Sequence, residues 1–257
     1  MKAKDIYNTL HAYLQIKKAV GRSQGVKIGN SYLDHQSHLN YPWFSALTLI
    51  QETEKSLSQV VKQAEIKLES LNRQPAVIVD PATKPKNTVN ILKKLGYYFK
   101  EDDAWLFYPQ TQPARPTKKL KAKRVISAKQ AQIYVSRVHD PVFSDWGDSD
   151  LSNWIASYKP GPSEHEYTYM YYVKNKLAAT GGIQCWQQYA LIFDIAVLPQ
   201  FRKQGLGGNI FTFLINQAKK LNKSIIFYDT EADSPAENLS LKLGFKRGFQ
   251  RQLYLKK

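Results

Sequence analysis

The run FDIAVLPQFRKQGLGGN, residues 193–209, is the most informative stretch of the sequence. It passes from an apolar segment through a basic loop into a segment whose apolar residues recur at helical spacing. A strand, a loop and a helix in this order place the unpaired first N–H groups of the helix, and the positive end of its dipole, beside the loop. The run therefore predicts a loop that binds a diphosphate.

Two features of this loop support an anionic ligand. Gly205 and Gly207 remove side chains that would hold a phosphate away from the backbone, and glycine adopts positive φ angles easily. Arg202 and Lys203 add positive charge. The loop is not a Walker loop, because it lacks Gly-Lys-Ser/Thr, and it is not a dinucleotide fingerprint, because Ile210 stands where a third glycine is needed.

The same loop resembles the central motif of the GNAT superfamily of acyl-CoA N-acyltransferases, V-x-P-x-x-R/Q-x-x-G-x-G/A. The matching residues are Val197, Pro199, Arg202, Gly205 and Gly207. A late motif of that family, a helix ending L-Y-x-K-x-G-F, is similar to residues 239–245, LSLKLGF. The resemblance covers residues 123–257 well and residues 75–110 weakly. It implies an α/β fold and acetyl-CoA as cosubstrate, with no metal.

The resemblance also implies roles for particular residues. The loop would bind the coenzyme A pyrophosphate, residues 195–197 would pair with the pantetheine arm, and the Val197 N–H would polarise the thioester carbonyl. The implied coenzyme-binding residues are Ile195, Ala196, Val197, Arg202, Lys203, Gln204, Gly205, Leu206, Gly207, Gly208 and Asn238. The expected activity is N-acetyltransfer from acetyl-CoA to a primary amine by direct attack, with a small molecule or peptide as acceptor.

The acid and the base of such a reaction are not where the family often has them. Ser240 stands where the family often has a tyrosine that protonates the departing thiolate, and Phe193 stands where it often has a glutamate base. Asp194 follows Phe193 and should point to the opposite face of the strand. The nearest substitutes for the acid and the base are Tyr228, Glu231 and Tyr171.

The two halves of the chain end alike. Residues 90–97, NILKKLGY, and 238–245, NLSLKLGF, lie 148 positions apart, and at the same offset Val77-Ile78-Val79 falls on Ile225-Ile226-Phe227. Such agreement indicates an internal duplication. We therefore expect two GNAT-like mixed-sheet α/β domains: a degenerate copy at 1–110, a basic Pro-rich linker at 111–124 and an acetyltransferase domain at 125–257. Residues 41–53 lack glycine and a basic cluster, so the first copy should not bind coenzyme A.

Hydrophobic periodicity and turn residues predict the individual elements. The expected helices are 6–19, 52–71, 128–138, 145–157, 205–220 and 234–243. The expected strands are 77–79, 104–108, 123–127, 167–173, 177–187, 189–197 and 224–229, with one further strand within 40–51 and two closing strands after residue 245. Residues 21–38 favour neither kind of element.

The charge is unevenly spread. The chain of 257 residues has a formal net charge of +16, and residues 111–130 hold seven Lys or Arg side chains and no Asp or Glu. Three prolines in 109–116 together with these charges favour an extended, solvated linker. The alternative is an anion-binding tether that directs the enzyme to RNA or the ribosome, although the loop at 202–208 already accounts for an anionic ligand.

Other features exclude or leave open further functions. The single cysteine, Cys185, excludes an intramolecular disulfide and favours a core residue. His35 and His38 have metal-like spacing but no acidic partner nearby in the sequence, so we interpret them as loop residues. Three aspartates, Asp145, Asp148 and Asp150, would cap a helix or attract an amine. The tyrosines at 167, 169, 171 and 172 would line an acceptor cleft or belong to an ordinary strand.

The start of the sequence has no apolar segment typical of a secretory signal, and no stretch is long and apolar enough to span a membrane, so a cytoplasmic protein without a membrane partner is expected. A second function of a different class is a non-catalytic acyl-CoA sensor, favoured by Ser240 and Phe193. It would bind the coenzyme without turnover.

Overall fold

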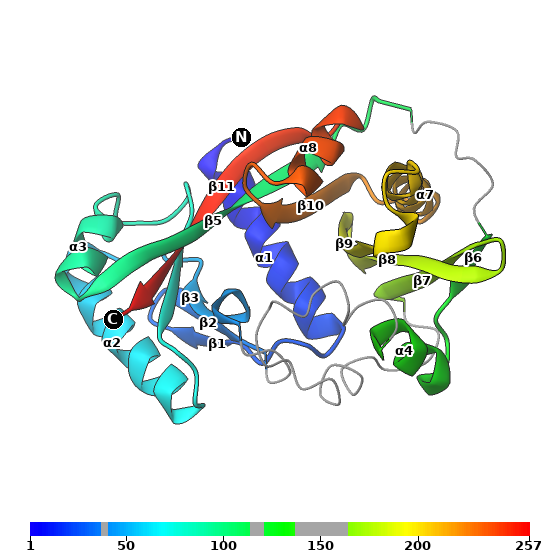
Figure 1. The fold of residues 1–257 in the computed structure, drawn as a ribbon. Helices are drawn as coiled ribbons and strands as arrows, with labels where there is room; N and C mark the ends of the chain where they lie inside the picture. Colours follow the sequence, from blue (N-terminus) through cyan, green and yellow to red (C-terminus); the bar gives the residue numbers. More distant parts are fainter. Residues whose placement is uncertain (37–40, 114–120, 137–163) are drawn as a thin grey trace. The chain divides into compact units, whose positions relative to one another are not determined.

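The computed structural model describes residues 1–36, 41–113, 121–136 and 164–257. The chain forms two compact units, one of residues 1–105 with 248–257 and the other of residues 106–247. Each unit is an α/β structure built on a mixed sheet (Figure 1). Two long strands, β5 (Tyr97–Tyr108) and β11 (Lys246–Lys256), contribute residues to both units. In the described residues, no helix is long and apolar enough to cross a membrane.

The first unit has the strand order β1-β2-β3-β4-β11-β5. Its elements are α1 (Ala3–Ala19), β1 (Val26–Ile28), β2 (Ser31–His35), the 3-10 helix η1 (Pro42–Phe44), β3 (Ser45–Thr48), α2 (Glu54–Ser70), β4 (Ala76–Val79), α3 (Thr88–Lys94), β5 and β11. The strands β3 and β4 are parallel, whereas β1 with β2, β2 with β3, and β4 with β11 are antiparallel. The ambiguous stretch 21–38 thus contains the hairpin of β1 and β2.

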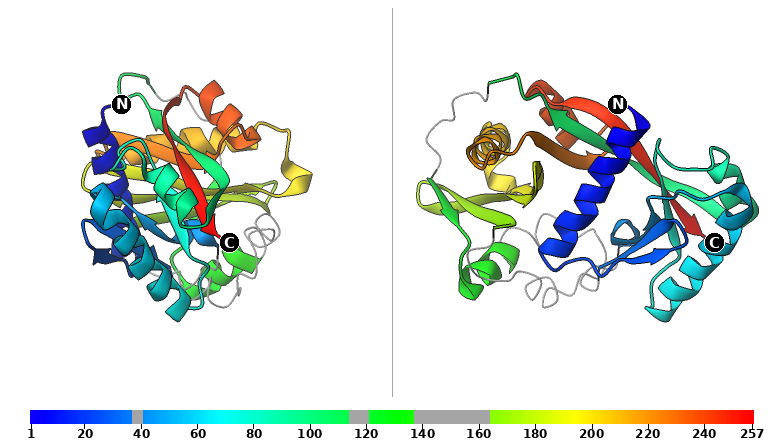
Figure 2. Two further views of the ribbon diagram at one scale, coloured as in Figure 1. Left: turned by 90° about the vertical axis from the view of Figure 1, so that its left-hand side faces the viewer. Right: turned by 180° about the vertical axis from the view of Figure 1, so that it is seen from behind.

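Alternation along the strands gives this sheet two apolar faces. Leu47, Val77 and Tyr254 belong to the core cluster that α2 covers, whereas Ile78 and Leu253 belong to a cluster on the other face. Figure 2 shows α2 along the first unit's sheet. Both faces are therefore buried, as expected for a sheet with a parallel strand pair.

The second unit has the strand order β5-β10-β9-β8-β7-β6. Its elements are the end of β5, β6 (Lys121–Arg124), α4 (Ala128–Tyr134), β7 (Glu166–Val173), β8 (Lys176–Trp186), β9 (Tyr189–Val197), the 3-10 helix η4 (Pro199–Phe201), α7 (Leu206–Lys220), β10 (Ile225–Glu231) and α8 (Pro235–Lys242). The strands β9 and β10 are parallel, and β6 to β9 are antiparallel in sequence order. The predicted hairpin turn has positive φ angles at Lys174 and Asn175, as a tight β-turn requires.

Most predicted elements are confirmed within two or three residues. The predicted helix 145–157, with Asp145, Asp148 and Asp150, lies outside the described residues. The two closing strands predicted after residue 245 are a single long strand, β11. The helices α3 and α8 are each followed by a glycine with a positive φ angle, +84° at Gly96 and +101° at Gly244.

The division into units differs from the predicted domain boundaries. The final strand, which we expected in the second domain, pairs with β4 of the first unit, with Leu253 opposite Ile78. Conversely, residues 106–108 belong to the second unit, where the Phe107 and Phe227 rings lie 6.2 Å apart. The two closing strands therefore do not divide as the repeat predicts: β11 lies mainly in the first unit, whereas β5 lies mainly in the first unit and only its end, residues 106–108, belongs to the second.

The predicted linker is more structured than its composition suggested. Residues 121–124 form β6, which pairs with β7. Its Arg124 guanidinium lies 4.2 Å from the centroid of the Tyr167 ring, and Lys121 Nζ donates to Asn175 Oδ1 at 2.6 Å. At the other end, Lys219 Nζ donates to the Gln112 carbonyl at 2.6 Å. Cation–π contact and strand pairing thus hold the described parts of this stretch, whereas Lys118 and Lys119 lie outside the described residues.

One buried ion pair lies where β5 and β11 meet within the first unit. The Arg251 guanidinium donates to both carboxylate oxygens of Asp103, with Nε at 3.2 and 3.1 Å, and the two side chains are 5% and 10% exposed. The guanidinium also lies 4.6 Å from the Trp105 ring and 4.9 Å from the Trp43 ring. Asp103 and Arg251 are themselves 148 positions apart, so the repeat brings equivalent positions into contact.

Removing one partner of this pair should destabilise the first unit strongly, because it leaves an uncompensated buried charge. We expect Asp103→Ala to lower the free energy of unfolding by about 3–5 kcal/mol, measured by urea denaturation. The matched control is Asp233→Ala, which removes an 87% exposed partner of Arg247 and should cost about 1 kcal/mol or less. Equal effects of the two substitutions would contradict this account.

Candidate active site

The strand β9 has different neighbours along its two edges. On one edge it pairs with β8 from Trp186↔Tyr189 to Ala179↔Val197. On the other edge the register with β10 covers Tyr189 to Leu191, the last pair being Phe227↔Leu191. Beyond Leu191, β9 therefore continues along β8 while β10 diverges from it.

A β-bulge lies in this divergent part of β9. Phe193 is opposite Gly182 and Ala196 is opposite Thr180, so Asp194 and Ile195 together face Gly181. Asp194 has a φ angle of +52°, a left-handed conformation that aspartate adopts more readily than most residues. A Cβ at Gly181 would lie 3.0 Å from Ile210 and 3.3 Å from Ile195, so this glycine lets α7 approach the bulge.

Beyond Leu191, the edge of β9 that does not pair with β8 (its outer edge) presents backbone N–H groups toward the space where β10 has diverged. The Leu198 N–H donates to the Ala178 carbonyl on β8 at 3.0 Å. Because backbone groups alternate along a strand, Ala196 also faces β8, whereas the N–H groups of Ile195 and Val197 face away from it. Of the three residues predicted to pair with a pantetheine arm, these two thus present free-edge groups. The Val197 carbonyl accepts from Arg202 Nε at 2.9 Å.

The loop after β9 leads directly into the N-terminus of α7. Gly205 is the N-cap residue with a φ angle of +75°, and no side chain caps the helix. The first turn of α7 contains no acidic residue. Arg202 and Lys203 are exposed beside it, and Lys203 also has a positive φ angle, +59°. The helix dipole, its unpaired N–H groups and two cations therefore coincide at one anion-binding position.

The glycines of this loop have separate tasks. Gly205 takes the left-handed conformation, and a Cβ there would meet nothing within 4 Å. A Cβ at Gly207 would lie 3.3 Å from Leu239 of α8, and one at Gly208 would lie 3.6 Å from Leu243. We interpreted Gly207 as making room for phosphate, but its missing side chain lets α7 and α8 pack closely.

Tyr228 of β10 lies at the same divergence. Its ring contacts Phe211 of α7 edge-on, with 5.0 Å between the centroids. Burial, with the negative charges of Asp229 and Asp194, outweighs the lowering effect of a hydrogen bond with Thr230 and raises the pKa of the Tyr228 phenol to about 12. Tyr228 thus remains a protonated donor at every physiological pH, close enough to Asp194 to respond to its charge.

The other candidate residues lie elsewhere. Glu231 is exposed at the end of β10. Tyr171 is fully buried on β7, where its ring contacts Phe213 of α7 at 5.6 Å, and burial raises its pKa well above the usual value. It pairs with Ala179, which pairs with Val197, so it lies two strands from β9, about 10 Å away. The structure therefore brings Tyr228, but not Tyr171, to the divergence of β9 and β10.

The positions that depart from the family pattern serve the core. Ser240 is fully buried, and its hydroxyl donates to the Ala236 carbonyl at 2.9 Å within α8. Phe193 is buried, and its ring lies over Gly182, where a Cβ would come within 2.6 Å. Asn238 is exposed on α8. The tyrosines Tyr169 and Tyr171 both pack against Phe213, which favours the ordinary-strand interpretation of the tyrosine run.

A residue that sequence patterns did not indicate contacts the bulge. Tyr134 of α4 is fully buried, and its hydroxyl donates to Asp194 Oδ2 at 2.9 Å. The two residues are 60 positions apart, so no local pattern could have linked them.

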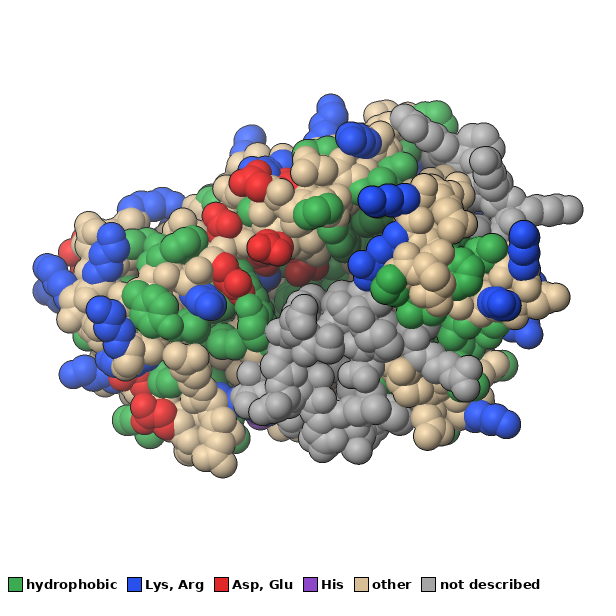
Figure 3. Space-filling model, in the orientation of Figure 1, with side chains coloured by type: hydrophobic (Ala, Val, Ile, Leu, Met, Phe, Trp, Pro, Cys, Tyr) green, Lys and Arg blue, Asp and Glu red, His purple; other side chains and the backbone are tan. Residues whose placement is uncertain are grey.

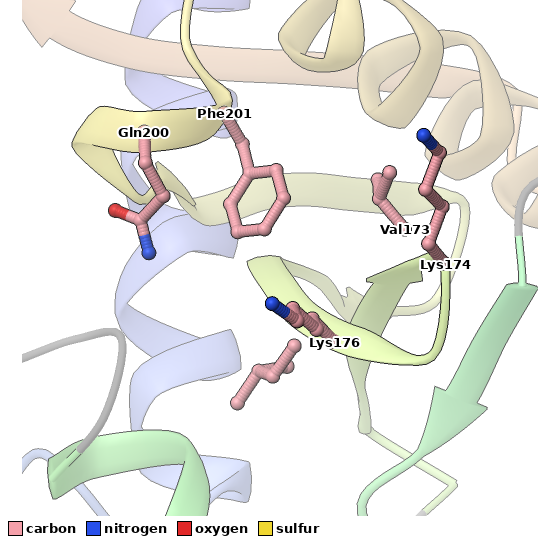
Figure 4. Close-up of a pocket in the computed structure, with 6 residues that line it drawn as sticks. Val173, Lys174, Lys176, Gln200 and Phe201 are labelled. Carbon is pink, nitrogen blue, oxygen red and sulfur yellow. The ribbon is translucent and has the colours of Figure 1, made fainter.

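A pocket of about 400 Å³ lies beside the loop. It is lined by the β7–β8 hairpin residues Val173, Lys174, Lys176 and Leu177 and by Gln200 and Phe201 of η4. Figure 4 shows Phe201 extending from η4 toward the strand that carries Lys176. The pocket lining thus includes an aromatic side chain and two lysines.

In the first unit, the helix equivalent to α7 is α2, and its N-terminus is capped by side chains. The N-terminus of α2 has a capping box between Thr53 and Ser56, with Ser56 N donating to Thr53 Oγ1 at 3.2 Å. The buried Glu52 carboxylate accepts from Asn30 N at 2.6 Å and from Ser56 Oγ at 2.8 Å. The chain's own oxygens thus fill the position that is open at α7, which is consistent with a first copy that does not bind coenzyme A.

The described residues do not support a reactive thiol, a metal site or a basic binding stripe. Cys185 is 1% exposed, and burial raises the pKa of its thiol to about 11, so it behaves as a core residue. His35 is half-buried, with Nδ1 3.3 Å from Ser45 Oγ, and His38 lies outside the described residues. The described residues contain no group of three metal-ligating side chains. On the face drawn in Figure 3, Lys and Arg are scattered rather than gathered in one stripe.

Comparisons with known proteins agree with this fold. A GCN5-related N-acetyltransferase from Kribbella flavida has a TM-score of 0.71 at 14% identity, with 96% of this chain and 94% of that chain covered. One from Sphaerobacter thermophilus has a TM-score of 0.66 at 11% identity, with 100% and 93% covered. A tandem GNAT protein from the clavulanic acid biosynthesis pathway has a TM-score of 0.58 at 11% identity, with 88% and 77% covered. No curated protein matches the sequence.

The second unit thus combines a mixed α/β sheet with an open strand edge beside a basic helix N-terminus. Residues 132–245 match the model of the acetyltransferase (GNAT) family. The matched residues lie within the second unit, and a tandem GNAT protein is among the solved structures with a similar fold.

The special role of Gly205 can be tested against a neighbouring glycine. We expect Gly205→Ala to lower the free energy of unfolding by about 1–2 kcal/mol, because alanine is strained at a φ angle of +75°. Gly208→Ala is the control: its Cβ would make ordinary contact at 3.6 Å, and helix propensity should stabilise it by about 0.5–1 kcal/mol. Urea denaturation measures both, and a Gly205→Ala variant as stable as wild type would contradict the assignment.

Proposed function

We propose that the second unit transfers an acetyl group from acetyl-CoA to a primary amine of a small molecule or peptide by direct attack. One observation carries the proposal: the outward N–H groups of Ile195 and Val197 lead along β9 to the uncapped N-terminus of α7. A pantetheine arm would extend the sheet beside β9, and its diphosphate would meet the helix dipole with Arg202 and Lys203. The residues present therefore fit the coenzyme.

The second unit contains candidate groups for stabilising the charge and for donating the proton in this reaction. An outward N–H of β9 would stabilise the negative charge that develops on the thioester oxygen. The amine nitrogen forms a bond to the carbonyl carbon and gives up its excess proton to water while the carbon–sulfur bond breaks. The departing thiolate needs a proton, and Tyr228 is the protonated donor at the divergence of the strands. Glu231 is exposed on the same strand, three positions farther along.

A non-catalytic acyl-CoA sensor is the second candidate. It is favoured by Ser240, whose hydroxyl is already engaged by the Ala236 carbonyl at the position where the family often has the acid. Such a protein would bind acetyl-CoA without releasing thiol. A polyanion partner contacting residues 111–124 also stays a prediction.

Acetyl transfer can be measured as free thiol. Incubation with acetyl-CoA and a panel of peptides, polyamines and aminosugars should release coenzyme A, detected with a thiol reagent, and buried Cys185 should add little background. Tyr228→Phe should lower kcat about 10²-fold with an unchanged KM for acetyl-CoA, because it removes the donor and keeps the ring. A folded protein that binds acetyl-CoA but releases no thiol with any amine would favour the sensor.

Coenzyme binding should occur once per chain. Calorimetric titration with coenzyme A is expected to give one site, because α2 is capped by its own side chains while α7 is open. Arg202→Ala with Lys203→Ala should weaken binding about tenfold or more through lost phosphate contacts. The control Lys220→Ala, in the last turn of the same helix, should bind normally. Two sites per chain, or equal loss in the control, would contradict the location.

A further inference from the structure

We propose that Arg247 of β11 permits coenzyme binding by neutralising the buried carboxylate of Glu237, which lies at the start of α8 beside the N-terminus of α7. The inference deepens the proposed function and rests on it, because it takes the coenzyme diphosphate to meet α7. Arg247 acts through Glu237 and not on the coenzyme, so it is a positioning residue.

The ion pair between Arg247 and Glu237 is close and bidentate. Arg247 Nε donates to Glu237 Oε1 at 2.5 Å, and Arg247 Nη2 donates to Glu237 Oε2 at 2.6 Å. Two parallel bonds of this kind fix the orientation of both groups. The bonds to Glu237, together with one to Asp233, hold the pKa of Arg247 above its usual value, so its charge is present at every physiological pH.

The same pair organises the turn between β10 and α8. Glu237 Oε2 accepts from the Asp233 N–H at 2.7 Å, and Arg247 Nη2 donates to Asp233 Oδ1 at 2.8 Å. The next residue, Ser234, is the N-cap of α8, and its Oγ accepts from the Glu237 N–H at 3.2 Å. The Glu237 carboxylate is therefore held in one place, in the first turn of α8.

This turn of α8 lies close to the proposed diphosphate position. A Cβ at Gly207, in the first turn of α7, would lie 3.3 Å from Leu239 of α8. Glu237 precedes Leu239 by two residues, so both belong to one turn of the helix. The carboxylate thus lies in the part of α8 that packs against the open end of α7.

The burial of Glu237 is the reason that its charge needs a partner. Its side chain is 1% exposed, so solvent and salt screen it poorly. Left unpaired, it would repel the negative charges of a diphosphate at α7. Arg247 cancels this repulsion, whereas the Asp233 side chain is 87% exposed and its charge is screened by water.

Calorimetric titration with coenzyme A tests the proposal in variants whose folding is verified by urea denaturation. Arg247→Met should raise Kd about tenfold, and the loss should shrink as salt is added, because salt screens the repulsion. Arg247→Lys keeps the charge and should bind within about threefold of wild type. The control Lys242→Met removes an exposed cation from the last turn of α8 and should bind normally.

A double variant separates charge from structure. Arg247→Met combined with Glu237→Gln loses the same bidentate bonds as Arg247→Met but leaves no buried charge, so it should bind within about threefold of wild type. Recovery of binding in this variant would support the proposal, because a purely structural role predicts no recovery.

The remaining outcomes separate this inference from the proposed function. An Arg247→Met variant that binds as tightly as wild type, or a double variant that binds as weakly as Arg247→Met, would overturn the inference and leave acetyl transfer standing. If Arg247→Met does not fold, Arg247→Lys and the double variant decide, and a tenfold loss in both would overturn it. A folded wild type that binds no coenzyme A would overturn the proposed function itself.

Discussion

The divergence of β10 from β9 after Leu191 is the constraint on which the proposed site depends. Because β9 stays paired with β8 to Val197, its shape is fixed while its other edge is left to a ligand. The bulge at Asp194, the outward N–H groups of Ile195 and Val197 and the start of α7 all follow along this one strand. The backbone of β9 and of the loop after it would thus position both the bound coenzyme and the reacting groups.

The two units show how a duplicated scaffold can diverge in function. Both contain a parallel strand pair and a long helix that follows the first strand of that pair. At α7 the helix N-terminus carries glycine and neighbouring cations, whereas at α2 a capping box and the Glu52 carboxylate occupy the same position. A few side chains at the helix N-termini therefore distinguish the two copies.

Local spacing predicted much of the fold, including the strand, loop and helix of residues 193–209. The run 193–209 indicated strand, loop and helix because glycine, proline and apolar periodicity act within a few residues. The positive φ angle of Asp194 left no such signal, and its partner Tyr134 lies 60 positions away. The pairing of β11 with β4 was also beyond reach, because a repeat predicts two similar units without saying which strand pairs with which. Gly207 was misread because its neighbour Leu239 comes from another helix.

The central claim is that coenzyme A lies along the outer edge of β9 and ends at α7. Hydrogen exchange of the full chain, with and without coenzyme A, tests it most directly. The account predicts slower exchange in the segment 193–209 and unchanged exchange in residues 49–57 at the start of α2. Protection at α2, or none along β9 and the α7 N-terminus under saturating coenzyme A, would contradict it.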